Sequence, residues 1–194
     1  MNVRRDNTRQ LILDTGHRLI AARGFAGVGL AEILADAQVP KGSFYHYFGS
    51  KEQYGQTLLQ GYFDTCVLQL DQLFDDPAVP ARQRLLRYWQ HWLSAHDEGC
   101  DGRRCLVVKL SAEVADLSDA MRVTLRDGTE RVIGRIARCI AAGRTDGSLC
   151  VVDPVATART LYSLWLGASL LAKLHRNSDA LREAMVATLV ILDP

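Results

Sequence analysis

The sequence has no uncharged apolar run that approaches the roughly 18 residues needed by a membrane-spanning helix. The longest candidate covers residues 160–172 and ends at Lys173. The first residues are charged and then amphipathic, and no apolar core of a signal peptide follows. We therefore expect a soluble, cytoplasmic protein with no membrane partner.

The sequence also has little excess of either charge sign, few prolines and no paired cysteine motif. The net charge is only +1, which argues against a protein that coats nucleic acid nonspecifically. Five prolines in 194 residues, most of them between apolar segments, favour long helices over a β-sandwich. The five cysteines contain no CxxC pair, so a zinc knuckle is not expected. Their odd number, without a secretion signal, indicates reduced thiols.

Apolar residues at helical spacing are present almost throughout the chain. They predict an all-α fold of about nine helices and no strand. Ser50, Ser118 and Ser178 are predicted N-caps, and Pro154 is a predicted first helical residue. The predicted helices cover residues 8–23, 30–37, 41–48, 51–75, 81–97, 103–117, 119–142, 154–175 and 179–192.

Two short helices joined by a tight turn, within residues 30–53, form the most informative pattern. They predict a helix-turn-helix, in which the first helix braces the second in the major groove of DNA. Phe44 and Phe48 are four residues apart and should pack inward on the bracing helix. The residues predicted on the opposite face are Lys41, Ser43, Tyr45, His46 and Tyr47.

Residues 39–52, VPKGSFYHYFGSKE, resemble the DNA-binding signature of the TetR family of bacterial repressors, V-x-K-G-[ST]-[LF]-Y-x-[HY]-F-x-[SN]-K-E. One nearby position departs from the family pattern. Ser or Thr is common where Gly29 stands, so only a backbone N–H is available there. The resemblance implies a helix-turn-helix DNA-binding domain over residues 1–50. It also implies a helical sensor and dimerisation domain over residues 51–194.

The resemblance further implies roles for individual residues on double-stranded operator DNA. Some are expected to read base edges or groove-lining sugars, and others to hold the register through phosphate contacts. The expected readers are Ser43, Tyr45 and His46; the expected phosphate contacts are Lys41, Tyr47 and Lys51, with backbone approach at Gly29 and Gly42. Because one such helix reads too few base pairs for useful specificity, we expect a homodimer on a near-palindromic operator.

The segment 154–175 is apolar nearly all round, so the helix it predicts must be buried on two sides. One side serves the core of the subunit, and the other is expected to meet a partner subunit together with the final helix. TetR-family proteins typically dimerise through their last two helices, which agrees. The residues expected at this interface are Leu161, Leu164, Ala168, Leu171, Leu181, Met185 and Leu189.

Cys105 differs from the other cysteines in its charged neighbours. It follows Arg103 and Arg104, precedes Lys109 by one helical turn, and lies near a predicted helix start. These positive charges and the helix dipole favour the thiolate, which attacks oxidants and electrophiles. Cys100 in the adjacent loop is a candidate resolving thiol. The remaining cysteines are Cys66 and Cys139, in apolar helices, and Cys150, without a charged partner.

A second resemblance concerns the same cysteine. Residues 105–118 and 161–173 resemble the NemR branch of the TetR family, whose members respond to electrophiles and oxidants through cysteine chemistry. The resemblance maps the reactive cysteine of that branch onto Cys105 and its lysine onto Lys173. An ammonium near Cys105 would stabilise a thiolate, and a neutral amine could trap an oxidised sulfur. Alternatively, Lys173 simply extends into solvent near a helix C-terminus.

The leading hypothesis is a dimeric repressor that leaves its operator when Cys105 is oxidised or alkylated. The alternative is release by a reversibly bound aromatic or amphipathic small molecule. Such a molecule would bind in a pocket lined by aromatic residues, although the same residues could simply form the hydrophobic core. These residues are Tyr62, Phe63, Tyr88, Trp89 and Trp92. A metal sensor using His91, His96, Cys100 and Cys105 is a further alternative. No catalytic or cofactor motif is found, so we expect neither an enzyme, nor a cofactor, nor a resident metal.

Overall fold

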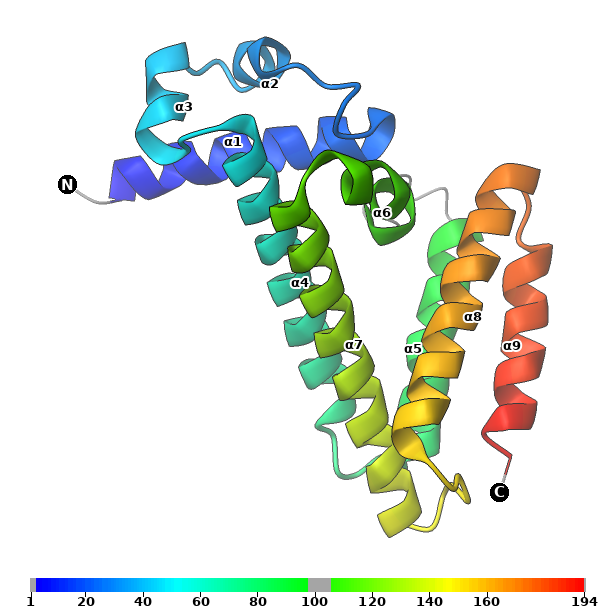
Figure 1. Cartoon of the computed structure of the whole chain (residues 1–194). Coiled ribbons are helices and arrows are strands. Elements are labelled where there is room, and N and C mark those ends of the chain that lie inside the picture. Colours follow the sequence, from blue (N-terminus) through cyan, green and yellow to red (C-terminus); the bar gives the residue numbers. More distant parts are fainter. Residues whose placement is uncertain (1–2, 98–105, 194) are drawn as a thin grey trace. The chain divides into compact units, whose positions relative to one another are not determined.

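The computed structural model describes residues 3–97 and 106–193, which form nine α helices and no strand (Figure 1). The expected all-α fold is therefore confirmed. Within these residues, no helix is both long enough and apolar enough to cross a bilayer. The helices are α1 (Val3–Arg23), α2 (Leu30–Asp36), α3 (Lys41–Tyr47), α4 (Lys51–Phe74), α5 (Ala81–Asp97), α6 (Leu106–Leu117), α7 (Asp119–Thr145), α8 (Pro154–His175) and α9 (Asp179–Ile191).

Helix ends mostly follow the predicted ones, with two clear differences. The first helix, α1, begins at Val3 instead of Thr8, because no proline or glycine separates Thr8 from the charged residues before it. Helix α7 continues to Thr145, past Gly143. A Cβ at Gly143 would lie 2.5 Å from a methyl carbon of Leu149, so this glycine serves close packing of the following loop and does not end the helix.

The chain is organised in two compact units. The first unit consists of Met1–Tyr62 and Asp101–Asp127, and the second of Phe63–Cys100 and Gly128–Pro194. Helices α4 and α7 contribute residues to both units. These boundaries differ from a division at residue 50, since α6 and the first turns of α7 belong to the same unit as the three N-terminal helices.

The core of the first unit is centred on Tyr54 of α4. Its side chain is fully buried, and its hydroxyl donates to the carbonyl oxygen of Ile12 in α1 at 3.1 Å. Burial raises the pKa of the Tyr54 hydroxyl above its ordinary value, so the group remains a donor. Gly16, one turn after Ile12, provides the space, because a Cβ there would lie 1.6 Å from the Tyr54 oxygen.

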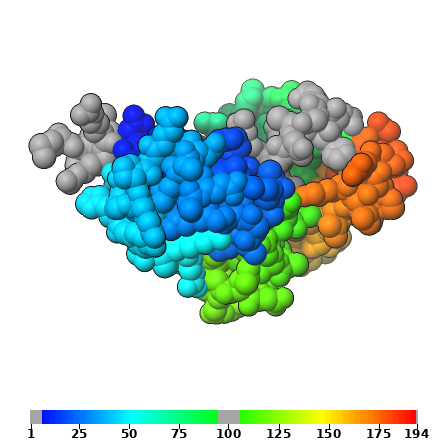
Figure 2. Space-filling view, turned by 90° about the horizontal axis from the view of Figure 1, so that it is seen from above, coloured from blue at the N-terminus to red at the C-terminus, as the bar shows by residue number. Residues whose placement is uncertain are grey.

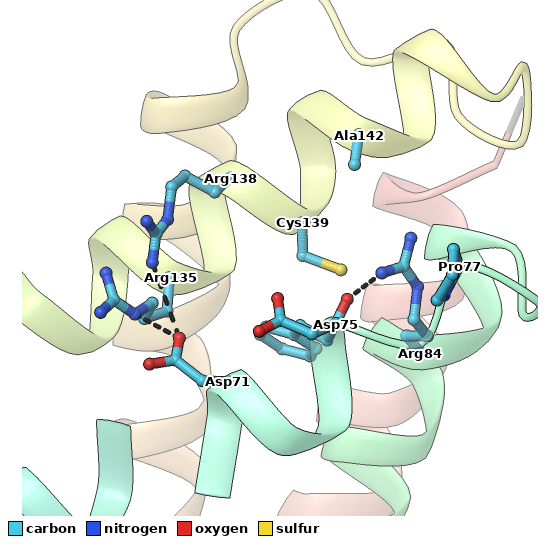
Figure 3. A pocket seen from close by; sticks show the side chains of 9 residues that line it. Asp71, Asp75, Pro77, Arg84, Arg135, Arg138, Cys139 and Ala142 are labelled. Carbon is cyan, nitrogen blue, oxygen red and sulfur yellow. Dashed lines mark hydrogen bonds and ion pairs between the residues drawn. The ribbon is translucent and has the colours of Figure 1, made fainter. Parts of the chain in front are cut away.

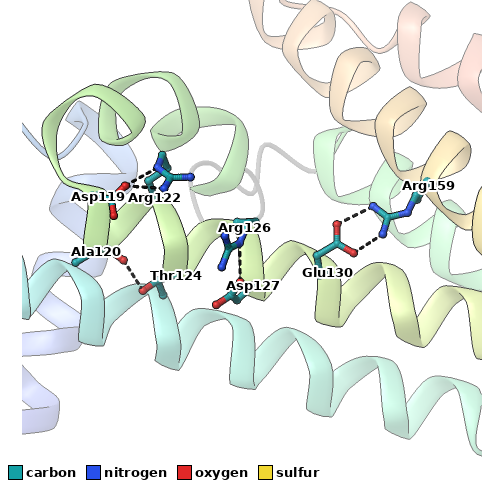
Figure 4. A network of polar contacts seen from close by, with 8 residues as sticks. All are labelled: Asp119, Ala120, Arg122, Thr124, Arg126, Asp127, Glu130 and Arg159. Atoms are coloured by element: carbon teal, nitrogen blue, oxygen red, sulfur yellow. Dashed lines mark hydrogen bonds and ion pairs between the residues drawn. The ribbon is translucent and has the colours of Figure 1, made fainter.

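The second unit is built around two stacked indoles. Trp89 of α5 and Trp165 of α8 have ring centroids 4.9 Å apart and an interplanar angle of 13°. Trp165 Nε1 also donates to Thr188 Oγ1 of α9 at 2.9 Å, so α5, α8 and α9 share one buried core. Arg159 of α8 forms a bidentate ion pair with Glu130 of α7, at 2.7 and 2.6 Å (Figure 4). This pair fastens α7 to the same group of helices.

We predict that Gly16→Ala destabilises the protein by about 1–3 kcal/mol, because the added methyl group would displace a buried, hydrogen-bonded hydroxyl. Chemical and thermal unfolding measure the change. Gly134→Ala in α7 is the matched control, because a Cβ there meets nothing within 4 Å. Alanine should stabilise that helix by up to about 1 kcal/mol. Unchanged stability of Gly16→Ala would contradict this account of the core.

Candidate nucleic-acid interface and sensor region

Helix α3 is anchored by the two phenylalanines predicted on its inner face. Phe44 is completely buried and Phe48 is 2% exposed. Their ring centroids lie 5.2 Å apart, and the Tyr54 ring lies 5.6 Å from Phe44 and 5.1 Å from Phe48. Because both anchors point into this aromatic cluster, the cluster determines which side of α3 faces outward.

The outward side of α3 carries the polar residues predicted there. Figure 2 looks onto the surface formed by α2 and α3, in blue to cyan. Within α3, Lys41, Tyr45 and His46 are exposed, and Ser43 and Tyr47 are half-buried. Tyr45 is 53% exposed while its ring packs edge-on against an anchor, the inner Phe44 ring. Hydroxyl, imidazole and ammonium groups thus lie together on a helix whose orientation is set by the buried aromatic cluster.

The turn between α2 and α3 sets the angle of the motif. Gln38 has a φ of 54°, a left-handed conformation that glutamine rarely adopts. Val39 N donates to the carbonyl of Leu34 at 3.0 Å, which satisfies the end of α2, and Pro40 is the N-cap of α3. The sequence predicts the turn through its Val-Pro pair, whereas the conformation of Gln38 is visible only in the structure.

Gly29 and Gly42, the two predicted points of backbone approach, both adjoin open space. A Cβ at either residue would meet no atom within 4 Å. Gly29 is the N-cap of α2, and no side-chain cap hydrogen bond forms there. Packing within the subunit therefore does not require glycine at either position, and the backbone at both is accessible from outside.

Lys51 differs from the free phosphate-binding amine predicted from the sequence. Its Nζ donates to the carbonyl oxygen of Phe25 at 2.8 Å and lies 4.6 Å from the centroid of the Phe25 ring. Burial lowers the pKa of the Lys51 ammonium, and the nearby Glu113 carboxylate opposes that effect. In this geometry the ammonium holds the loop after α1, so a phosphate contact by Lys51 requires another side-chain rotamer.

Two charged residues of α6 form hydrogen bonds to the end of α1 and to the same loop. The sequence did not predict this role for either residue. Lys109 Nζ donates to the Ala22 carbonyl near the end of α1 at 2.8 Å. The Glu113 carboxylate accepts hydrogen bonds from the backbone N–H groups of Phe25, at 3.1 Å, and Ala26. Their spacing of four residues on a mostly apolar helix places both on one face, and this is the signal that could have identified them.

Further contacts hold α2 and the start of α7 in the first unit. Ion pairs join Arg23 of α1 to Glu32 of α2 and the Arg18 side chain to Asp36. All four side chains are partly exposed, so each pair stabilises the unit only modestly. Ser118, which precedes α7, bonds to Glu52 of α4. The helix-turn-helix is therefore connected by polar contacts to α1, and α4 is connected to the start of α7.

Two segments of the chain match known protein families. Residues 12–53 match "Bacterial regulatory proteins, tetR family", and residues 81–188 match "Tetracyclin repressor-like, C-terminal domain". The chain belongs to the tetR family. The helix-turn-helix match lies within the first unit described above.

Similar proteins cover nearly the whole chain. The HTH-type transcriptional repressor NemR of Escherichia coli (strain K12) is 41% identical over 180 residues, which are 92% of this chain and 90% of NemR. The HTH-type transcriptional repressor DhaR of Mycobacterium sp. (strain GP1) is 33% identical over 191 residues, 98% of this chain and 94% of DhaR. The crystal structure of reduced E. coli NemR has a TM-score of 0.91 and 40% identity, covering 96% of this chain and 97% of that one. This tetR-family chain is therefore a transcriptional repressor and not an enzyme.

The residues predicted at the dimer interface of this tetR-family protein lie in different environments within the subunit. Leu161, Ala168 and Leu181 are buried inside the subunit. They pack between helices of the second unit because α8 is apolar all round, and the sequence alone does not show which side meets the subunit core. Leu164 and Met185 are half-buried, while Leu171 and Leu189 are exposed.

The apolar side chains that remain exposed on α8 and α9 include Leu171 and Leu189 of the predicted interface. On α8, Gly167 is exposed and is followed at helical spacing by Leu170, Leu171 and Leu174, with exposures of 54, 46 and 73%. On α9 the exposed residues are Val186, Leu189 and Val190. The two helices pack side by side (Figure 1). Large exposed apolar patches are typical of interaction surfaces, and the last two helices are where the family resemblance predicts dimerisation.

The predicted redox residues are only partly covered by the structure. Cys105, Cys100 and the preceding Arg103–Arg104 pair lie outside the described residues. Lys173 is exposed near the C-terminal end of α8. Cys139 is buried, and burial raises the pKa of its thiol to about 12, which makes a thiolate at neutral pH rare.

The alternative sensor residues fall in several environments. Trp89 and Phe63 are core residues, whereas Tyr88 and Trp92 are half-buried beside them in the second unit. Tyr62 is also half-buried and belongs to the first unit, where its ring stacks on that of His17. Among the described residues, no group of three or more His, Cys, Asp or Glu side chains could hold a metal ion. Cys100 and Cys105, two of the four residues proposed for a metal sensor, lie outside those residues.

We predict that Leu174→Glu combined with Val190→Glu converts the protein to monomers, because each carboxylate would be buried against apolar surface in a dimer. Sedimentation analysis should show at least a roughly tenfold rise in the dimer dissociation constant, which corresponds to about 1.4 kcal/mol. Leu68→Glu on α4, where the leucine is 58% exposed, is the control and should leave the dimer unchanged. If the double variant dimerises as strongly as the wild type, this face is not the dimer interface.

Proposed function

We propose that this protein is a homodimeric repressor that reads a near-palindromic operator with α3 and is released when Cys105 is oxidised or alkylated. The observation that carries this proposal is the connection between α6 and the loop before α2. Cys105 immediately precedes the first residue of α6, Leu106. Helix α6 contacts that loop through Glu113 and the adjoining end of α1 through Lys109. As a regulator of chromosomal DNA it would act in the cytoplasm.

The proposed reading of DNA rests on the exposed side of α3. Ser43, Tyr45 and His46 would contact base edges or sugars, and Lys41 with Tyr47 would contact phosphates. The inner aromatic cluster gives α3 one orientation before DNA arrives, so little conformational entropy is lost on binding. Two copies in a dimer would supply the symmetry that matches a near-palindrome.

The proposed release begins with bond formation at sulfur. The Cys105 thiolate would add to the β-carbon of an activated alkene, forming an S–C bond as the C=C π bond breaks, and the resulting carbanion would take a proton from water. Alternatively, the thiolate would attack a peroxide oxygen, breaking the O–O bond and releasing hydroxide or an alkoxide, and the sulfenic acid formed would condense with the Cys100 thiol to give a disulfide and water. Lys173 is retained in the proposal as a cation that would favour the Cys105 thiolate.

A small change at α6 would be enough for release. Lys109 and Glu113 satisfy three backbone groups at the end of α1 and in the following loop. A shift of α6 that breaks these bonds would favour another position of the helix-turn-helix. Only a few kcal/mol of differential stability between two dimer geometries is needed to change their populations tenfold or more. The similarity to NemR, which was crystallised in a form described as reduced, supports thiol chemistry here.

Release by a reversibly bound aromatic or amphipathic molecule is the second candidate. It is favoured by Trp89 Nε1, which is buried and has no hydrogen-bond partner among the described residues. Trp92 and Trp165 lie 5.6 and 4.9 Å from the Trp89 ring, so a ligand that accepts a hydrogen bond there would have an aromatic surrounding. This candidate predicts release without any covalent change at Cys105.

We predict that Tyr45→Ala and Lys41→Gln each weaken operator binding by at least about tenfold while leaving the fold intact, because both side chains are exposed. Lys41→Gln should also reduce the slope of affinity against salt concentration by about 1, since one phosphate contact is lost. Fluorescence anisotropy with labelled operator measures both effects. Arg182→Gln on α9 removes an equally exposed charge and should bind as wild type does. Wild-type affinity of Tyr45→Ala would refute the proposed reading face.

We predict that N-ethylmaleimide lowers operator affinity of the wild-type dimer about tenfold or more and leaves Cys105→Ser almost unaffected. Mass mapping at limiting reagent should find Cys105 modified first and Cys139 last, because the Cys139 thiol is buried. Cys150→Ser, which removes an exposed thiol, is the matched control and should still respond. If Cys105→Ser releases DNA as wild type does, covalent sensing at this residue is wrong, whereas the DNA-reading proposal is unaffected.

A further inference from the structure

A basic cavity lies within the second unit, where α4 ends, α5 begins and α7 passes its middle turns (Figure 3). Its volume is about 520 Å³, which is within the range of sites for small organic ligands. Three arginines and two aspartates line it, beside apolar wall from Phe74 and Ala142. The charged residues are Asp71, Asp75, Arg84, Arg135 and Arg138.

Arg84 is the unusual member of this group. It is only 9% exposed, and one of its terminal nitrogens donates to the carbonyl oxygen of Phe74. Its Nε has no hydrogen-bond partner, and it forms no ion pair with a carboxylate among the described residues. The Asp146 carboxylate interacts electrostatically with Arg84 but forms no ion pair with it. It accepts hydrogen bonds from Ala81 N at 2.8 Å and Ser148 N at 2.9 Å. A buried guanidinium without a carboxylate is costly unless an anion or water compensates it.

The second pair of arginines shares one carboxylate. Arg135 Nε lies 2.5 Å from Asp71 Oδ1, whereas the nearest nitrogen of Arg138 lies 3.6 Å from the same oxygen. The Arg138 side chain is 64% exposed, so its guanidinium is weakly held and accessible. In Figure 3, Arg84 and Arg138 lie on opposite sides of Cys139, with the cavity between them. Each guanidinium therefore adds positive charge to a different side of the cavity.

We propose that this cavity binds a small organic anion, with its carboxylate or phosphate group held by the exposed Arg138 and attracted by the positive charge of the buried Arg84. Guanidinium groups bind both oxyanions through charge-assisted, often bidentate hydrogen bonds. The carbon body of the ligand would lie against Phe74 and Ala142, which line the same cavity. The proposal uses no residue of α3 and no reactive cysteine, so it stands independently of the function proposed above.

The experiment measures binding of two probes to the full-length dimer, sodium benzoate and phenyl phosphate, by calorimetry and by thermal unfolding. Benzyl alcohol supplies the same ring without the anion, and sodium chloride matches the ionic strength. We expect saturable binding of one or both anions and a rise in Tm that neither control produces. Binding of only one anion identifies which of the two groups the site accepts.

Arg138→Gln should weaken that binding at least about fivefold, because it removes an exposed charge-assisted contact with little effect on folding. Arg131→Gln is the matched control: Arg131 lies on the same helix, pairs with Asp64 of α4 at 2.8 Å, and is not part of the cavity. It should bind the anions as wild type does. The proposal is overturned if neither anion acts beyond sodium chloride, or if Arg138→Gln and Arg131→Gln bind equally well.

Discussion

The packing of Phe44 and Phe48 against Tyr54 is the contact on which the DNA-facing side of this protein depends. Helix α3 spans only Lys41–Tyr47, too short to be stable by its own hydrogen bonds. Two buried rings and the hydroxyl bond from Tyr54 to α1 give it both stability and one orientation. Every polar group that α3 presents outward is positioned by apolar groups on its other side.

The loop between α1 and α2 is held by side chains from other helices of the first unit. Lys51 and Glu113 reach it from α4 and α6, and they satisfy backbone groups that a loop would otherwise leave to water. Lys109 bonds to the adjoining end of α1. Gly24 in this loop has a φ of 86°, and the Glu113 carboxylate lies where a side chain would stand. Such a close fit makes the position of α2 sensitive to small movements of α6. The contacts are polar and partly exposed, so breaking them costs little compared with disrupting the core.

The second unit combines a rigid aromatic core with two surfaces that remain unsatisfied within the subunit. The stacked indoles and the Thr188 hydrogen bond hold α5, α8 and α9 together. Outside that core, apolar residues of α8 and α9 remain exposed, and Arg84 is buried without a carboxylate among the described residues. Both features have the same physical meaning. Groups that cost free energy in the isolated subunit indicate where a second molecule, a partner subunit or an anion, would be stabilising.

The sequence by itself determined the all-α fold, the helix-turn-helix and the two-sided character of α3, because these depend on local periodicity, caps and a four-residue spacing of aromatic rings. It did not reveal that α1 starts at Val3, that Lys51 turns inward, or that Leu161, Ala168 and Leu181 belong to the subunit core. Nor did it show Lys109 and Glu113 holding a loop almost 90 positions away along the chain. Those outcomes were decided only by tertiary structure. A helix that is apolar all round can bury any of its sides, and a long charged side chain can reach several partners, so the neighbouring helices determine which contacts form.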